Sequence, residues 1–173
     1  MKIVLVGYMG SGKSIVGRQL SQVLDANFLD LDTEIEKEEG MSISSLFEKR
    51  GEIYFRKKEF STLLQCLDSN EKSIIATGGG TPCYGNVMET LSERPDVITV
   101  YLKASLDTLT ERLAEEKAKR PMIAHLETKE LLNDFIRKHL FERNFFYFKA
   151  QKTIIVDDKT VSEIVDEIVA TLF

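Results

Sequence analysis

The sequence has no tryptophan, and only two cysteines, three prolines and two histidines occur in its 173 residues. Cys66 and Cys83 form no C-x-x-C pair, so neither a thiol metal cluster nor a disulfide framework is indicated, and we expect reduced thiols in a cytoplasmic protein. No apolar run approaches the roughly 18 residues of a membrane span, and the run at 1–7 is too short for a signal peptide. We therefore expect no association with a membrane.

An excess of positive charge is also absent. The formal net charge of −5 argues against a protein that covers nucleic-acid phosphates, so an anionic ligand would have to be bound by individually placed Arg and Lys side chains. Hydrophobic residues make up 43% and charged residues 29%, which is typical of a folded domain. No repeat or low-complexity linker divides the chain, and we predict a single domain over 1–173 that acts as a monomer.

Short apolar runs alternate with amphipathic stretches along the chain. The runs predict strands at 3–6, 27–31, 73–77, 97–102 and 152–156. The amphipathic stretches predict helices at 13–24, 44–50, 52–66, 86–94, 106–116, 129–148 and 161–172. This alternation is typical of an α/β protein with a parallel sheet covered on both faces. The polar segment 117–128 fits neither period and is a candidate mobile loop.

One motif, G-x-x-x-x-G-K-[ST], matches at every fixed position from Gly7 to Ser14. It follows a predicted strand and opens a predicted helix, where glycines let backbone N–H groups point at phosphate oxygens. Lys13 can reach the β- and γ-phosphates of ATP, and the Ser14 hydroxyl can join a Mg²⁺ shell. The alternative is a glycine-rich turn that binds nothing, but the strand-to-helix context favours a triphosphate site.

Asp30 and Asp32 lie at the C-terminal end of the second predicted strand, where parallel sheets place their ligands. We expect this segment to be extended, so that both carboxylates point to one side. Phosphoryl transfer can use one carboxylate near the metal and another at the attacking hydroxyl. The alternative is that Asp32 caps a helix beginning near Thr33 and that Asp30 is simply exposed.

Four arginines and a glycine run are further candidates for ligand contacts: Arg56, Arg112, Arg120, Arg143 and Gly78-Gly79-Gly80. The glycines follow the third predicted strand and would allow a close backbone approach to a ligand, although a flexible turn explains them equally well. Arg120 is either a flexible surface charge or part of a lid that excludes water. Arg56 is either a solvated helix charge or a ligand contact. Cys83 and Tyr84 are interpreted as packing residues, and neither His125 nor His139 is given a catalytic role.

Taken together, these residues resemble the shikimate kinases from Lys2 to about Val156. The segments that carry the resemblance are the 7–14 loop, 30–32, 51–59, 78–80, 119–121 and 143–147. The resemblance implies transfer of a phosphoryl group from ATP to the 3-hydroxyl of shikimate, a step towards chorismate and the aromatic amino acids. It also implies a three-layer α/β/α P-loop kinase fold with a central five-stranded parallel sheet, a helical substrate-binding region at about 32–66 and a lid at about 113–128.

The resemblance assigns roles to individual residues. It implies that Lys13, Asp32 and Arg120 are catalytic and that Ser14 and Asp30 lie at Mg²⁺. The implied shikimate contacts are Asp32, Arg56, Gly78, Gly79, Gly80 and Arg143. The implied ATP contacts are Gly10, Ser11, Gly12, Lys13, Ser14, Ile15, Arg112, Arg120 and Lys159. Guanidinium forks suit a planar carboxylate, which agrees with an arginine pair at the acceptor.

Two positions depart from the family pattern. Ile15 stands where threonine is usual, and Lys159 lies where many members carry an arginine that faces adenine. Other readings are a gluconate or nucleoside monophosphate kinase, a nucleotide-dependent switch and an inactive kinase-like binding module. The sequence has no N-K-x-D or D-x-x-G motif of a GTPase. Retention of Lys13, Ser14, Asp32 and Arg120 argues against an inactive module.

Overall fold

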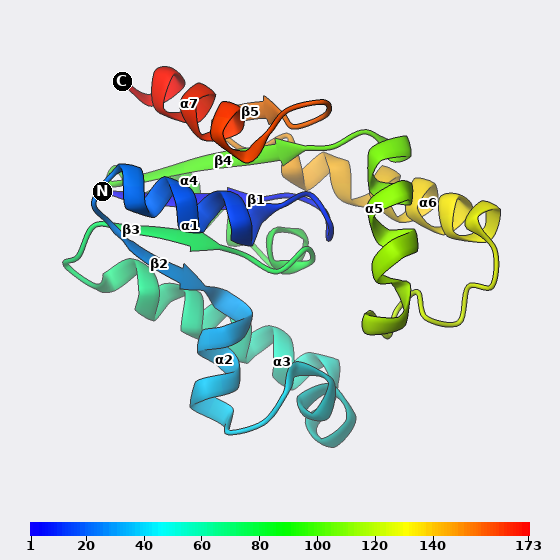
Figure 1. Cartoon of the computed structure of the whole chain (residues 1–173). Helices are drawn as coiled ribbons and strands as arrows, with labels where there is room; N and C mark the ends of the chain where they lie inside the picture. Colours follow the sequence, from blue (N-terminus) through cyan, green and yellow to red (C-terminus); the bar gives the residue numbers. More distant parts are fainter.

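A five-stranded parallel sheet forms the centre of the computed structural model, which describes residues 1–173 (Figure 1). The strand order is β2-β3-β1-β4-β5. The strands are β1 Lys2–Val6, β2 Asn27–Asp30, β3 Ser73–Ala76, β4 Val97–Lys103 and β5 Lys152–Ile155. Every residue of β1 and β3 is buried, which explains why these strands are apolar runs rather than alternating patterns.

Seven helices and two short 3₁₀ turns connect the strands. They are α1 Lys13–Val23, α2 Leu31–Glu39, α3 Ile43–Asp68, α4 Val87–Ser92, α5 Leu106–Glu116, α6 Lys129–Tyr147, α7 Val161–Leu172, and the turns η1 Thr81–Cys83 and η2 Lys117–Lys119. The side chains of Ser42, Ser105, Thr128 and Thr160 each accept a backbone N–H in the first turn of the following helix. These caps explain why α3, α5, α6 and α7 begin where they do.

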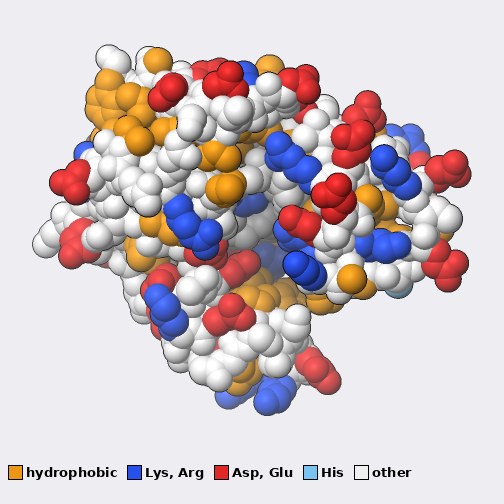
Figure 2. Space-filling view, in the orientation of Figure 1, with side chains coloured by type: hydrophobic (Ala, Val, Ile, Leu, Met, Phe, Trp, Pro, Cys, Tyr) orange, Lys and Arg blue, Asp and Glu red, His pale blue; other side chains and the backbone are white.

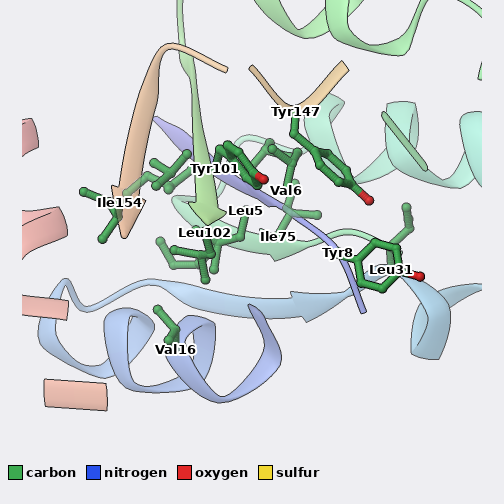
Figure 3. Packing of buried hydrophobic residues seen from close by; sticks show 14 of the residues in the cluster. Leu5, Val6, Tyr8, Val16, Leu31, Ile75, Tyr101, Leu102, Tyr147 and Ile154 are labelled. Carbon is green, nitrogen blue, oxygen red and sulfur yellow. The ribbon is translucent and has the colours of Figure 1, made fainter. Parts of the chain in front are cut away.

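Helices cover the sheet on both faces. Helices α1 and α7 pack against each other on one face, while α4 packs on β4 from the other. Figure 3 shows Leu102 on the side of α1 and Val16, with Tyr101 and Tyr147 on the opposite side. The Tyr101 and Tyr147 ring centroids are 5.2 Å apart, so the end of α6 is packed against β4. No helix combines the length and the apolar character that crossing a membrane requires.

The predicted fold class is confirmed, and so are all five predicted strands to within two residues. The extended conformation expected around Asp30 and Asp32 is wrong. Helix α2 begins at Leu31, and Asp32 lies in its first turn. Asp30, rather than Asp32, is the cap: its Oδ1 accepts the Thr33 N–H at 3.3 Å. Leu31 is completely buried, so helix capping and core packing together end the strand at Asp30.

Helix α3 is interrupted at Gly51, as the two separate helices predicted at 44–50 and 52–66 require. Gly51 has φ 81° and ψ 172°, a conformation open almost only to glycine. Its neighbourhood is otherwise uncrowded, because a methyl group there would meet no atom within 4 Å. The lobe formed by α2 and α3 projects from the sheet in Figure 1, and Gly51 sets the direction of its two helical segments.

We predict that Gly51→Ala lowers the free energy of unfolding by about 1–3 kcal/mol, the cost of a non-glycine residue in this backbone region. Urea unfolding followed by circular dichroism measures the change. Gly40→Asn is the matched control, since Gly40 has φ 66° and ψ 23°, which asparagine tolerates. Equal stability of Gly51→Ala and the wild type would contradict this account of the break.

Candidate functional site

The carboxyl ends of the strands meet at one edge of the sheet. The register places Leu5 and Asp30 opposite Ala76, so the segments that follow β1, β2 and β3 emerge together. A cleft of about 480 Å³ opens at this edge. Figure 2 shows a hollow between the α2–α3 lobe and the part of the molecule formed by α5 and the loop after it, with both basic and acidic side chains around it.

The loop between β1 and α1 wraps around its own lysine. Lys13 Nζ donates hydrogen bonds to the carbonyl oxygens of Gly7 at 2.7 Å and Tyr8 at 3.0 Å. Gly7, Gly10 and Gly12 all have positive φ, and a methyl group at Gly7 would lie 2.7 Å from the Leu102 carbonyl oxygen. The loop therefore requires glycine for its path, and it leads into the N-terminus of α1, where anions bind.

The ammonium group of Lys13 is buried in the site. Burial lowers the pKa of Lys13 to about 8, and the positive charges of Arg120 and Arg143 act in the same direction. The carboxylates of Asp32 and Asp30 oppose that shift. Bound phosphates would supply the missing negative charge, so the ammonium is arranged for an anionic ligand.

Ser14, Asp30 and Asp32 form the polar floor of the cleft. Ser14 Oγ donates to Asp30 Oδ2 at 2.7 Å. Burial raises the pKa of Asp32 to about 6, with smaller contributions from the charges of Asp30 and Glu59. No group of three His, Cys, Asp or Glu residues could enclose a metal ion here. A hydroxyl beside a carboxylate nevertheless fits Mg²⁺, which favours few protein ligands and takes the rest from water and phosphates.

Two arginines from distant helices converge on the glycine run. A methyl group at Gly80 would lie 2.8 Å from Arg56 Nη2 and 3.1 Å from Arg143 Nη2. A methyl group at Gly79 would lie 3.2 Å from Arg143 Nη1. A side chain at Gly80 would therefore displace Arg56, and one at Gly79 would crowd Arg143. At Gly78, a methyl group would approach Asp32 Oδ1 to 3.3 Å, so the same backbone also borders the carboxylate.

Glu59 is a site residue that the sequence analysis missed. It is 3% exposed, and its carboxylate accepts from Arg56 Nη1 at 2.8 Å and from Thr81 Oγ1 at 2.7 Å. The carboxylate thus fixes Arg56 to the segment after the glycine run. Its spacing of three residues from Arg56 on one helix was the available signal. That signal alone did not separate a buried pair from a surface pair.

His139 connects the phosphate loop to α6. Its Nδ1 lies 2.8 Å from the Tyr8 hydroxyl, and its ring packs edge-on against Tyr8 and Phe135. Burial lowers the pKa of His139 to about 4, and the charge of Arg143 one turn further along acts in the same direction. Burial also raises the pKa of Tyr8, so a protonated hydroxyl and a neutral imidazole share this hydrogen bond. Sequence analysis gave His139 no role, because only the fold brings it to Tyr8.

The remaining predicted ATP residues lie around the outer part of the cleft: Ile15, Arg112, Arg120 and Lys159. Arg112 Nη1 donates to the Gly10 carbonyl oxygen at 3.1 Å, so it reaches the phosphate loop. Arg120 is instead ion-paired with Glu116, with 2.7 Å between Nη2 and Oε2. Lys159 is ion-paired with Glu167. Arg120 and Lys159 thus lie beside the cleft, but the charged group of each is ion-paired with a neighbouring glutamate.

The loop predicted to be mobile has an anchor. Ile123 is completely buried, and the backbone N–H groups of Ile123 and Ala124 donate to the Arg120 carbonyl oxygen. Lys117 Nζ also donates to the Leu126 carbonyl oxygen at 2.6 Å. The loop is therefore a structured turn held by Ile123 and by these hydrogen bonds.

Comparisons with known proteins agree on one family. The shikimate kinase family model matches residues 9–173. The shikimate kinase of Flavobacterium johnsoniae is 50% identical over 171 residues, covering 99% of this chain and 98% of that protein. The crystal structure of shikimate kinase from Bacteroides thetaiotaomicron superposes with a TM-score of 0.90 at 33% identity, covering 99% and 98% of the two chains. Shikimate kinase from Acinetobacter baumannii in complex with shikimate gives 0.82 at 31% identity, covering 99% and 92%.

The depressed pKa of His139 predicts a loss of stability in mild acid. The unfolded chain binds a proton near pH 6.5, whereas the folded protein binds it only near pH 4, so stability falls as the pH decreases through this window. Allowing for solvent around the half-buried ring, we expect the wild type to lose about 1 kcal/mol between pH 7 and pH 5 through this residue.

Urea unfolding at pH 7 and pH 5 tests this expectation. His139→Gln, which cannot titrate, should lose less stability than the wild type, whereas His125→Gln in the loop should match the wild type. The same pH dependence in all three proteins would show that His139 is not the group responsible.

Proposed function

This chain belongs to the shikimate kinase family, and from that premise we propose how its residues share the work of phosphoryl transfer. The enzyme transfers the γ-phosphoryl group of ATP to the 3-hydroxyl of shikimate, giving 3-phosphoshikimate and ADP. The convergence of Arg56 and Arg143 on Gly79 and Gly80, next to a phosphate loop, is the observation that supports this assignment most strongly. The roles of the other site residues are inferred from the charges of ATP and of shikimate.

The donor lies along the loop from Gly7 to Ser14. Backbone N–H groups of Gly10, Ser11 and Gly12 bind phosphate oxygens, since they lie on the loop that leads into α1; Ser11 gives up its hydrogen bond to the Tyr8 carbonyl oxygen. Lys13 exchanges its hydrogen bonds to Gly7 and Tyr8 for the β- and γ-phosphates. Its buried ammonium compensates charge on the transferred group.

The outer wall of the cleft receives the rest of ATP. Arg112, Ile15 and Lys159 border the nucleoside, and Lys159 occupies the place that arginine holds in many family members. Arg120 leaves Glu116 and turns to the phosphates when ATP binds, because a triphosphate carries more charge than one exposed carboxylate. Arg120 then stabilises the charge that develops during transfer, and the 113–128 segment excludes water from it.

The acceptor binds between Asp32 and the two arginines, next to the phosphate loop that holds ATP. Arg56 and Arg143 bind the planar carboxylate of shikimate through N–H donors, and Gly78, Gly79 and Gly80 let these guanidinium groups and Asp32 lie close to the backbone. Asp32 orients the 3-hydroxyl and accepts its proton as the oxygen attacks the γ-phosphorus. The leaving oxygen remains on ADP.

Ser14 and Asp30 would hold Mg²⁺, which supplies charge neutralisation at the phosphates when bound. Within the same proposal the enzyme acts as a cytoplasmic monomer on small molecules, with no membrane or nucleic acid as partner. A single chain supplies every residue assigned above, and both cysteines are free thiols, which supports that part of the proposal.

Asp32→Asn should lower kcat by about 10²–10⁴-fold, the range lost when a general base is removed. The asparagine amide has the size of the aspartate carboxylate but cannot accept the proton of the shikimate hydroxyl. Initial rates of ADP release at saturating ATP and shikimate measure the decrease in kcat. Glu34→Gln, in the first turn of the same helix, is the control for removing one negative charge. A wild-type kcat in Asp32→Asn would exclude the role given to Asp32.

Acceptor preference tests the arginine clamp. ADP release should require shikimate and remain at the level of the acceptor-free reaction with gluconate or nucleoside monophosphates.

Arg143→Lys should raise the KM for shikimate about tenfold, since lysine cannot form the paired contact to a carboxylate. The KM for ATP should stay near the wild-type value. Turnover with gluconate but not with shikimate would overturn the acceptor assignment.

A further inference from the structure

Tyr84 covers one face of Arg56. Arg56 Cζ lies 3.8 Å from the centroid of the Tyr84 ring, the shortest of the cation–aromatic distances in the structure. Phe55 is the other aromatic ring near Arg56, and its centroid is 5.1 Å from the same atom. The distance of 3.8 Å is that of a guanidinium group stacked directly on an aromatic ring.

The backbone around Tyr84 is shaped to place this ring. Tyr84 follows the turn η1 and is extended, with φ −119° and ψ 145°. Gly85 comes next at φ 56°, which turns the chain away. Tyr84 is 39% exposed as a whole residue, whereas the Arg56 side chain is 19% exposed, so the ring lies on the outer side of the guanidinium. No hydrogen bond involves the Tyr84 hydroxyl, so its contribution comes from the ring.

Glu59 and Tyr84 restrict Arg56 in different ways. Glu59 holds Nη1 through one hydrogen bond, which fixes one nitrogen but leaves the guanidinium free to tilt about it. The Tyr84 ring fixes the plane. Nε of Arg56 is buried, has no hydrogen-bond partner and faces Glu52, whose Oε1 lies 3.9 Å away. Nη2 makes no hydrogen bond and, unlike Nε, is not buried, so it is the nitrogen left for a carboxylate.

We propose that Tyr84 is a positioning residue for the acceptor: it holds the plane of Arg56 so that Nη2 points at the carboxylate of shikimate. This inference rests on the arginine clamp of the proposed function. It gives a role to a residue whose sequence context predicted only packing. The contribution is to acceptor binding and not to the chemical step, because Tyr84 acts through Arg56 and lies outside the cleft that holds the phosphates.

Steady-state kinetics of Tyr84→Leu test the proposal. Tyr84→Leu should raise the KM for shikimate about threefold to tenfold, the range expected from losing one partly desolvated cation–aromatic contact. The kcat and the KM for ATP should change by less than about twofold, because Tyr84 makes no contact with either. Tyr84→Phe should keep the wild-type KM for shikimate, since it retains the ring.

Phe145→Leu is the matched control. Phe145 is 67% exposed and pairs with Lys149 at 4.8 Å, away from the cleft, so this variant removes a similar contact without touching the acceptor site. It should keep all wild-type kinetic constants. Urea midpoints of every variant show whether folding contributes to the kinetic changes.

A double-mutant cycle with Arg56→Met separates this inference from the clamp itself. If Tyr84 acts through Arg56, the effect of Tyr84→Leu on kcat/KM for shikimate disappears in the Arg56→Met background. An equal loss in both backgrounds, or an unchanged KM in Tyr84→Leu, would overturn the role of Tyr84 alone. A wild-type kcat/KM in Arg56→Met would instead overturn the arginine clamp.

Discussion

The in-register parallel pairing of β1, β2 and β3 is the constraint on which the whole site depends. Because Leu5 and Asp30 both lie opposite Ala76, the phosphate loop, the Asp30 carboxylate and the glycine run leave the sheet at one edge. A parallel sheet has the carboxyl ends of all its strands at one edge, so residues that follow different strands meet there although they are far apart in sequence. The parallel arrangement of the strands thus places the ATP site next to the shikimate site.

Charge at this edge is balanced locally in a protein whose net charge is −5. Lys13 is held by carbonyl oxygens, Arg56 by Glu59 and Arg120 by Glu116, so these three cations have partners before any ligand arrives. These partners differ in how readily the cation can exchange them for a ligand. A buried carboxylate such as Glu59 fixes its arginine permanently, whereas an exposed ion pair such as that of Arg120 contributes little and exchanges readily for a phosphate.

Features fixed by local patterns could be predicted from the sequence. The phosphate loop, the break at Gly51 and the five apolar strands follow from motif, glycine geometry and burial on both faces. The conformation of Asp32 could not, because a buried Leu31 and the Asp30 cap decide it together. The Tyr8–His139 contact spans 131 positions, and Thr81 reaches Glu59 across 22, so no local signal identifies either pair. Tyr84 was read as packing because stacking depends on where Arg56 lies in space.

The central claim is that two arginines select the acceptor by its carboxylate. Measuring kcat/KM for shikimate and for its carboxamide, which is neutral but of nearly the same shape, tests this claim directly. We predict that the carboxamide is at least about tenfold poorer, since charged hydrogen bonds to both guanidinium groups are weakened. Equal kcat/KM values for the acid and the amide would contradict the account, because the arginines would then have no part in recognising the acceptor.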